Sequence, residues 1–403
     1  MNKSEPASRA SLSALTLRLL VIAFASAGPV LAVAPLGMAP LLIVIVALAF
    51  AAERYSSGVW SLPSRTPAAL FLILLIWSAL SLTWALNPAS GARKLLDLAL
   101  TGGILQGLLA LAPRVSTAQR RHLALALLVG MAIGLSLLAV ETLFDFPLYR
   151  AVMGNSDPRL VDLVESKRSV DALPLLVWPA CLALAVLGRA WLGALFAGLF
   201  AIACFKLTAS SATLGMLVSL VVFAASFISV KWVRRALSLA TVLGFVLIVP
   251  LAIFAYEHGG TTSHWLKHSA QHRVEIWHFA AQRTLEQPLF GYGFNASRFV
   301  PNGDAISQFL PPGQSLIPLH PHDGFLQIWL ELGAVGATIT GALLLTGLRA
   351  IGKLPTASMR FALAGYAAGM IVASLAFGIW QSWWMATLAF SAGAYKVIGP
   401  DHD

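Results

Sequence analysis

The sequence has few charged side chains. Asp, Glu, Lys and Arg make up only 11% of its 403 residues, whereas a soluble domain usually carries about 25%. Hydrophobic residues make up 58%, and the mean hydropathy is +0.80. Apolar stretches near the ~20 residues that cross a bilayer recur along the whole chain. This composition excludes an ordinary soluble domain and predicts an all-α, polytopic integral membrane protein.

Several motifs of other protein classes are also missing. The chain has no Walker A loop, no dinucleotide-binding fingerprint, no HExxH sequence and no DxD pair of carboxylates between its predicted spans, so a metal-dependent transfer from a nucleotide sugar has little support. The two cysteines, Cys181 and Cys204, lie in apolar stretches and are predicted to be small buried residues rather than a disulfide or a metal pair. Few charges fall inside the apolar stretches (Asp97, Glu141 and Lys206 come closest), so an ion-coupled transporter would lack its usual relay.

About twelve membrane helices are predicted, at roughly 14–33, 35–52, 67–86, 94–112, 122–144, 172–188, 190–208, 210–230, 236–255, 323–348, 360–378 and 381–398. Ala32-Val33-Ala34 resembles a signal-peptide cleavage site, but a second span follows at once, so we expect an uncleaved first helix. Lys and Arg are densest in the short loops on the side of the N-terminus, which predicts that both termini are cytoplasmic. These loops account for much of the net charge of +10, which therefore does not indicate nucleic acid binding.

Two polar segments interrupt the apolar pattern, residues 145–171 and 256–321, and both fall on the outer side of this topology. Within the second, residues 264–286 mix apolar and polar side chains as a helix does, and the Pro288 to Gly293 stretch ends that pattern. We expect a helical cap over the outer membrane surface. The chain then divides into residues 1–255 with nine spans, the large loop 256–321, and residues 322–403 with three spans.

His322 stands at the beginning of the tenth predicted span. Asp323 is a good N-cap for the helix that follows. The helix dipole disfavours a protonated imidazole whereas Asp323 favours it, so we expect a neutral histidine that can accept a proton near pH 7. The alternative is an interfacial histidine that only caps the helix.

Arginines on the outer side are candidates for phosphate binding, because the planar guanidinium matches phosphate oxygens. Arg168 precedes the sixth span, and Arg273 begins the predicted helix of the large loop. Arg93 and Lys94 add weaker candidates in a short outer loop. The alternative for each arginine is a headgroup anchor or a surface ion pair with a nearby glutamate, which is the commoner role of a lone surface arginine.

Seven of the nine histidines lie in or beside the large loop: His258, His264, His268, His272, His278, His320 and His322. His264, His268 and His272 are four apart, which allows a shared helix face and raises the question of a zinc site. No cysteine or carboxylate stands at a matching spacing, so we expect a solvated helix face and no metal.

Residues from about 270 to 336 resemble the O-antigen ligase family. The family's motif is a histidine, then Asn, Ser or Gln, then nine residues and Gly-x-x-Gly. The matching stretch here is His322-Asp323, nine residues, and Gly333-Ala334-Val335-Gly336. Asp323 departs from the usual second residue. From the residues alone, the two glycines predict close packing through small side chains.

Two further stretches add to the resemblance. Arg273-x-Glu275-Ile276-Trp277 and Pro288-Leu289-Phe290-Gly291-x-Gly293 resemble the loop signature of the same family. A Ser-Arg pair common in relatives corresponds here to Ser210-Ser211, so no arginine is carried over at that place.

The resemblance implies a GT-C-like fold and an inverting, metal-independent glycosyltransferase without a cofactor. The donor would be a glycan on undecaprenyl pyrophosphate and the acceptor a sugar of lipid A core, at the periplasmic face of the bacterial inner membrane among membrane lipids. His322 would orient or deprotonate the acceptor hydroxyl, and cations would neutralise the pyrophosphate. The implied site comprises His322 as the catalytic residue, Arg168, Arg273, Arg93 and Lys94 at the pyrophosphate, and Asp323 and Trp277 in support.

Three alternatives stay open. An O-antigen polymerase or a protein O-oligosaccharyltransferase would use the same donor with another acceptor. A transporter of the lipid-linked glycan would need alternating access. A structural scaffold would give no reason for the outward histidines and arginines. The sequence does not determine the oligomeric state.

Overall fold

The structure is a computed structural model that describes residues 11–58, 65–144, 147–153, 168–207, 209–307, 315–317 and 319–400. Within these ranges the regular elements are helices, apart from one isolated β-bridge between Ile306 and Ser315. The predicted all-α class is therefore confirmed. Residues 154–167, which form the middle of the first polar segment, lie outside the described residues.

The long helices follow the apolar stretches. In chain order they are α1 (Ala14–Val33), α2 (Met38–Ser57), α3 (Arg65–Leu80), α4 (Pro88–Leu111), α5 (Thr117–Leu143), α6 (Pro147–Met153), α8 (Pro174–Val186), α9 (Ala190–Lys206), α10 (Ser210–Glu257), α11 (His268–Glu286), α12 (Gly324–Ile351), α13 (Thr356–Leu375) and α14 (Ser382–Ile398). Side chains cap several starts: Ser13 begins α1, Asn87 begins α4, and Ser116 with Gln119 forms a capping box at α5.

Eight helices in the described ranges are long and apolar enough to cross a membrane, which makes this a polytopic membrane protein. The predicted spans 172–188 and 190–208 differ from this, because α8 and α9 have only 13 and 17 residues. The predicted span 381–398 is α14, also 17 residues long. Large apolar side chains on the outer helices face outward. Only 17% of the most apolar stretch of α3 is buried, as expected of a lipid-facing helix.

Two of the predicted spans lie within the 48 residues of α10. The helix is interrupted at Ser229, whose φ of −160° and ψ of 105° are extended. Before this residue, Ser211 bonds to Leu375 near the end of α13, and Phe227 stacks under Arg360 near its start. After it, α10 approaches α13 again at the bond between Thr241 and Tyr366. The first half thus descends along α13, and the second half returns from Ser229 toward the same end.

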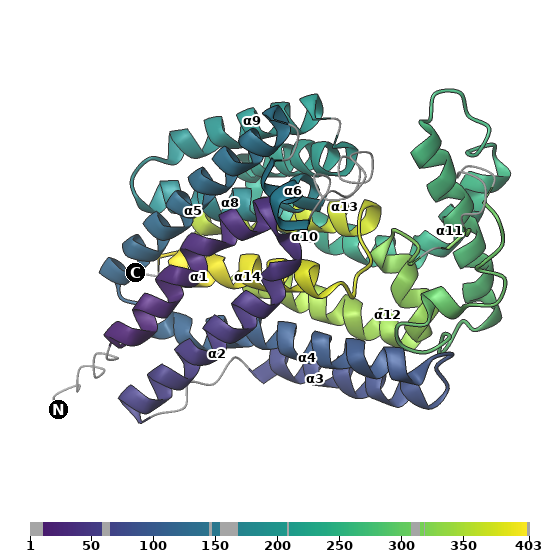
Figure 1. The fold of residues 1–403 in the computed structure, drawn as a ribbon, viewed down its shortest axis with the longest axis horizontal. Coiled ribbons are helices and arrows are strands. Elements are labelled where there is room, and N and C mark those ends of the chain that lie inside the picture. The colour runs from purple at the N-terminus through teal and green to yellow at the C-terminus, as the bar shows by residue number, and fades with distance from the viewer. Residues whose placement is uncertain are drawn as a thin grey trace.

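The two ends of the molecule carry different residues. α1 begins and α14 ends at one end of the bundle, and α11 lies at the other (Figure 1). At the first end Arg114 pairs with Glu53 at 2.9 Å, and Arg120 donates to the backbone carbonyls of Lys396 and Val397. These cations, all predicted to lie in cytoplasmic loops, therefore gather at the end opposite α11.

α1 and α5 cross in close contact through glycines. A Cβ on Gly28 would lie 2.3 Å from the carbonyl oxygen of Gly130, and a Cβ on Gly130 would lie 2.3 Å from that of Ala25. Gly134 is similarly tight against Gly28. Because helix association in lipid depends on van der Waals contact between backbones, these glycines fix the crossing.

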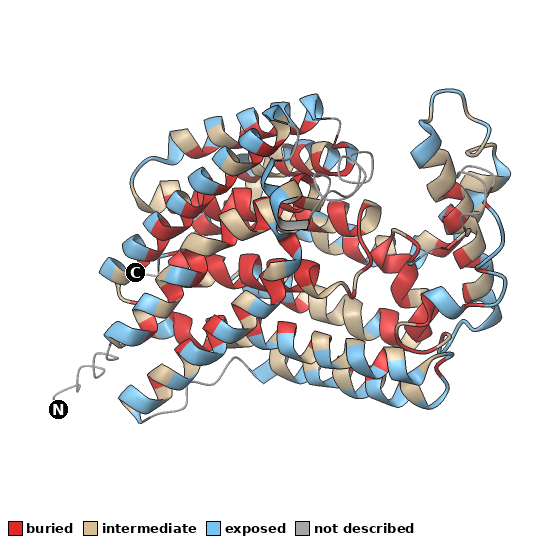
Figure 2. Ribbon diagram, viewed as in Figure 1, coloured by how far each residue is buried: buried red, intermediate tan, exposed pale blue. Residues whose placement is uncertain are grey.

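The described part of the large loop contains the helix α11. α11 runs from His268 to Glu286, and its buried residues Ile276, Ala280 and Ala281 pack against Ala252 of α10 and Leu326 of α12. Buried residues gather around α13 and α14 and again where the cap meets α12 (Figure 2). The cap therefore has an apolar core that holds it over the start of α12.

Candidate functional site

His322 is held in one tautomer by the α13–α14 connection. Its Nδ1 lies 2.9 Å from the carbonyl oxygen of Ala376. A carbonyl only accepts, so Nδ1 carries the proton and Nε2 keeps its lone pair. Burial lowers the pKa of His322 to about 4; the bond to Ala376 opposes this shift, and the nearby Arg273 and His272 add to it. The imidazole is therefore neutral near pH 7, as the sequence predicts, with one nitrogen free to accept.

The backbone at His322 is in the left-handed region, with φ of 58°. Residues other than glycine rarely adopt this conformation, which costs them about 1–2 kcal/mol. Such strain persists only where the surroundings over-determine it, and it gathers at functional sites. The Ala376 contact and the following helix cap together impose it.

His320 is a second buried histidine, to which the sequence assigns no role. The backbone N–H of His322 faces its Nδ1, and that of Gly378 faces its Nε2, each at 3.2 Å. Burial lowers the pKa of His320 well below its usual value, and His322 and Arg298 lower it further. A neutral imidazole accepts at one nitrogen only, so a given tautomer ties this histidine either to His322 or to the α13–α14 connection.

Asp323 is the N-cap of α12. Its Oδ1 accepts from the N–H of Leu326 at 2.8 Å, and the residue is 2% exposed. Burial raises the pKa of its carboxyl to about 7, whereas bonds from the N–H groups of Leu326 and Phe325 lower it. The family's Asn or Ser at this place would also cap a helix, so Asp323 keeps the capping function.

Arg273 lies beside this histidine pair. Its guanidinium is half-buried, and it has no hydrogen bond or ion pair with any other described residue. Burial lowers its pKa, and Asp171 raises it. The Nε2 of the adjacent His272 is buried without a partner in the described part of the chain. The guanidinium of Arg273 and the imidazole of His272 thus both lie within electrostatic range of His322.

Asp171 interacts both with the start of α10 and with Arg273. Its Oδ1 accepts from the N–H of Ala212 at 3.0 Å, in the first turn of α10. Arg168 lies three residues before it in a short helical stretch, beside the buried Ser169. The structure thereby brings the start of α10, the segment of Arg168 and the Arg273 side of the cap into one neighbourhood.

The remaining predicted residues fall into two groups, according to whether they contact the segment that carries His322. Trp277 donates from Nε1 to the carbonyl of Pro321 at 3.0 Å, so it anchors the residue before His322. Lys94 pairs with Asp97 at 2.8 Å, and Arg93 reaches the carbonyl of Ala89. These last contacts lie within α4 and do not connect either cation to His322.

The zinc interpretation requires three histidines on one helix. α11 begins at His268, so His264 precedes it and the shared face has only two of the three. Among the residues that the structure describes, no three His, Cys, Asp or Glu side chains gather in a way that could hold a metal ion.

Glu331 holds the end of the cap against the membrane helices through hydrogen bonds. The sequence assigns no role to this residue. It is fully buried, and its carboxylate accepts from the N–H of Asn295 at 2.7 Å, the hydroxyl of Ser297 at 2.5 Å and the indole of Trp380 at 2.7 Å. The N–H of Ser297 donates to it at 3.3 Å and the amide of Gln327 at 2.9 Å. An acidic residue inside an apolar helix was the available signal for this role.

α12 breaks at Gly333, with φ of 63° and ψ of −163°. The freed N–H groups of Ala334 and Val335 donate to the carbonyls of Pro288 and Leu289. A Cβ on Gly333 would lie 2.3 Å from the Leu289 oxygen. Close packing was predicted here, but the neighbour is a loop backbone and the helix itself is interrupted.

An apolar cavity of about 470 Å³ begins directly below this site. Its wall includes Gly324 and Phe325 at the start of α12 and Ile351 at its end, so it extends along the helix. α3, α4, α8, α10, α13 and α14 supply the other walls, mostly with aliphatic and aromatic side chains. Such a space fits a hydrocarbon chain.

Residues 194–341 match the model of the O-Antigen ligase family. Over this segment, which is less than half of the chain, the protein is similar to the O-antigen ligase family. The O-antigen ligase segment runs from α9 to the middle of α12 and contains Arg273, Trp277 and His322. Arg93, Lys94 and Arg168 lie outside it.

Relatives match over part of their length. A "Putative polysaccharide ligase" of Rickettsia prowazekii (strain Madrid E) is 36% identical over 121 residues, which are 29% of this chain and 29% of that relative. A second "Putative polysaccharide ligase", from Rickettsia bellii (strain RML369-C), is 30% identical over 170 residues, which are 40% of this chain and 41% of the relative. The chain thus aligns with less than half the length of these relatives.

Proposed function

We propose that this protein is a polysaccharide ligase of the membrane surface, which transfers a glycan from undecaprenyl pyrophosphate to a sugar hydroxyl of lipid A core. The observation that carries the proposal is the fixed tautomer of His322, which leaves an accepting nitrogen within electrostatic range of Arg273. The family of the matching segment supports the reaction class.

In this reaction the acceptor hydroxyl oxygen attacks the anomeric carbon of the donor. A new glycosidic bond forms, the bond to the pyrophosphate oxygen breaks, and that oxygen keeps the electron pair. The hydroxyl proton passes to Nε2 of His322 and then to solvent. Attack opposite to the leaving group inverts the anomeric centre.

A pKa of about 4 makes His322 a weak base. Its first task is therefore to orient the hydroxyl, and proton transfer follows as the bond to the anomeric carbon forms. Arg273 and Arg168 stabilise the charge that develops on the leaving pyrophosphate. Arg93 and Lys94 contribute positive charge at longer range.

The donor's polyprenyl chain occupies the apolar cavity below the site. Gly324 and Phe325 connect the two, because they line the cavity and directly follow His322 and Asp323. The cap then covers the reacting groups from the water side, in a GT-C-like arrangement at the periplasmic face of the inner membrane.

His322→Asn is the sharpest variant for a test. Asparagine tolerates the left-handed backbone but lacks the imidazole, and we expect transfer by the purified protein to fall at least ~100-fold. His258→Asn is the matched control, because His258 is exposed at the end of α10. Near-normal transfer by His322→Asn, with His258→Asn also active, would remove the role of His322.

The acceptor is tested in the same assay, with EDTA present. Undecaprenyl-pyrophosphate glycan is offered with lipid A core, with unlinked donor glycan or with a pilin-like protein. Product on lipid A core confirms the ligase. Product on another acceptor alone points to a polymerase or a protein O-oligosaccharyltransferase. No product with any acceptor, while the protein moves the donor across a vesicle bilayer, contradicts the proposal and favours a transporter.

A further inference from the structure

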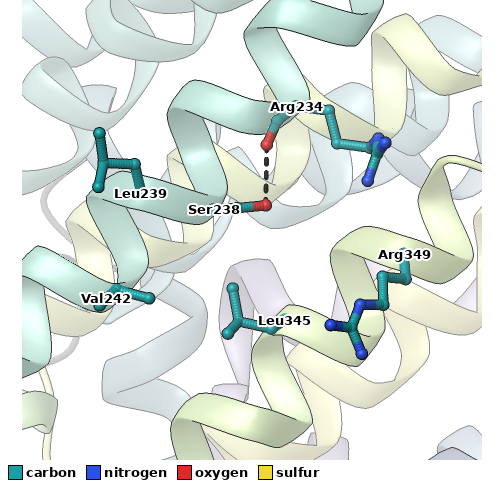
Figure 3. Close-up of a pocket in the computed structure, with 6 residues that line it drawn as sticks. All are labelled: Arg234, Ser238, Leu239, Val242, Leu345 and Arg349. Atoms are coloured by element: carbon teal, nitrogen blue, oxygen red, sulfur yellow. Dashed lines mark hydrogen bonds between the residues drawn. The ribbon is translucent and has the colours of Figure 1, made fainter.

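A second pocket lies between α10 and α12, at the end of α12 opposite His322. Its volume is about 280 Å³, and it is lined by Arg234, Ser238, Leu239 and Val242 of α10 and by Leu345 and Arg349 of α12. Figure 3 shows the two arginine side chains on one side of the pocket, with Leu239 and Val242 on the other. Neither arginine belongs to the site described above.

The pocket carries two positive charges and no negative one. Within the described residues, neither guanidinium has a hydrogen bond or an ion pair, and no carboxylate lines the pocket. Gly352 packs beside Arg234, where an added Cβ would lie 3.0 Å from its Nε. The hydroxyl of Ser238 donates to the carbonyl of Arg234 at 3.0 Å, so its oxygen stays free to accept. Two like charges on facing helices repel unless an anion lies between them.

The other wall is apolar and open. Leu239 and Val242 are 59% and 42% exposed, and Val246, one turn further along the same helix, is 59% exposed. These side chains form a stripe that leads from the arginines along the outward face of the second half of α10. A ligand seated here has an anionic group and a hydrocarbon part.

Neighbouring residues place the pocket at the level of lipid headgroups. Trp232, two residues before Arg234, is 65% exposed, and the guanidinium of Arg235 lies 4.8 Å from its ring centroid. Exposed tryptophan with Lys or Arg is typical of the membrane–water boundary. Basic pockets between membrane helices at this depth recognise anionic lipid headgroups.

We propose that this pocket binds an anionic phospholipid. Arg234 and Arg349 hold the phosphate oxygens, and the acyl chains lie along Leu239, Val242 and Leu345. The bound lipid then clamps the second half of α10 to the end of α12. These are the two membrane helices on which the cap packs, so the lipid stabilises the frame of the transfer site without entering it.

The test is native mass spectrometry of the full-length protein released from micelles that contain phosphatidylglycerol or phosphatidylcholine. The double variant R234Q/R349Q is compared with R235Q, which removes one neighbouring charge outside the pocket. We expect retention of phosphatidylglycerol to fall about 25-fold in the double variant, about fivefold for each arginine. R235Q should retain it as the unaltered protein does, and phosphatidylcholine should bind weakly throughout.

Three results would overturn the proposal. Equal retention in the double variant would mean that the arginines do not hold the lipid, and equal retention of phosphatidylcholine would remove the charge recognition. Displacement of the lipid by millimolar inorganic phosphate would make soluble phosphate the ligand. Thermal unfolding in detergent checks that the double variant is folded. If it is not, R234Q and R349Q are measured singly, with the same fivefold expectation.

Discussion

At the scale of single residues, the proposed chemistry depends on the charge of His322. Its pKa of about 4 lies below the usual value because the ring is buried, so the neutral form dominates down to mildly acidic pH. The protonated form has no free nitrogen to accept the hydroxyl proton. When Asp323 is replaced by an uncharged asparagine, transfer should therefore stay constant between about pH 5 and 8 and fall as the pH drops through about 4.

This pH profile is best measured in the Asp323→Asn background. Asp323 has a pKa of about 7 and would add a second titration within the plateau, whereas asparagine keeps the cap without a charge. An acid limb centred near 6.5 instead of near 4 would show that the reacting group is not the buried His322.

Arg273 gives a second prediction at this scale. Its guanidinium has no hydrogen bond or ion pair with another described residue, so Arg273→Gln should remove a charge-assisted contact to the donor worth about 1.5–3 kcal/mol. We expect kcat/KM for the donor to fall roughly 10- to 100-fold. Arg283→Gln is the control on the same helix, because Arg283 is already paired with Glu286 at 2.9 Å. Equal effects of the two variants would argue for general electrostatics rather than a binding contact.

At the scale of elements, the break in α12 is specified by Gly333. Its combination of φ and ψ is essentially restricted to glycine, and a Cβ would meet the Leu289 backbone. Gly333→Ala should therefore destabilise the protein by at least ~1–2 kcal/mol and lower its unfolding temperature in detergent.

Gly347→Ala is the comparison for this variant. Gly347 lies on the same helix, and an added Cβ there meets nothing within 4 Å. If Gly333→Ala unfolded no earlier than Gly347→Ala, the break would not depend on glycine. The same experiment tests whether the loop from Pro288 to Gly293 keeps its place against α12.

The sequence predicted the helices better than the connections between them. Hydrophobic runs located most helices, and the mixed pattern of residues 264–286 predicted the cap helix. The basic residues at 231–235 were expected to form a loop, yet they are helical, and the chain reverses at Ser229 alone. The periodicity of hydrophobic residues indicates which face of one helix is buried. It does not indicate where a single residue takes up an extended backbone.

The site was predictable in part for the same reason. His322, Arg273 and Trp277 follow from local motifs, and they do lie around one place. The Ala376 carbonyl that fixes the tautomer is 54 residues from His322, and the partners of His320 and Glu331 are also distant in sequence. Such pairings arise from the packing of α12 against the α13–α14 connection, which no local pattern encodes.

At the scale of the whole molecule, the cavity extends along α12 from Gly324, beside the site, to Ile351 at the end of the helix. Gly347 lines this cavity, so Gly347→Phe would place a ring in the space assigned to the polyprenyl chain. Displacing about two methylenes of that chain, at about 0.8 kcal/mol each, should raise KM for the undecaprenyl donor about tenfold. A donor with a three-isoprene chain should be affected much less, because it ends nearer His322. Gly198→Phe is the control, since Gly198 also has open space around an added Cβ but lies on α9, outside the cavity wall. An equal rise in KM for both donors, or none for either, would mean that the lipid follows another path through the bundle.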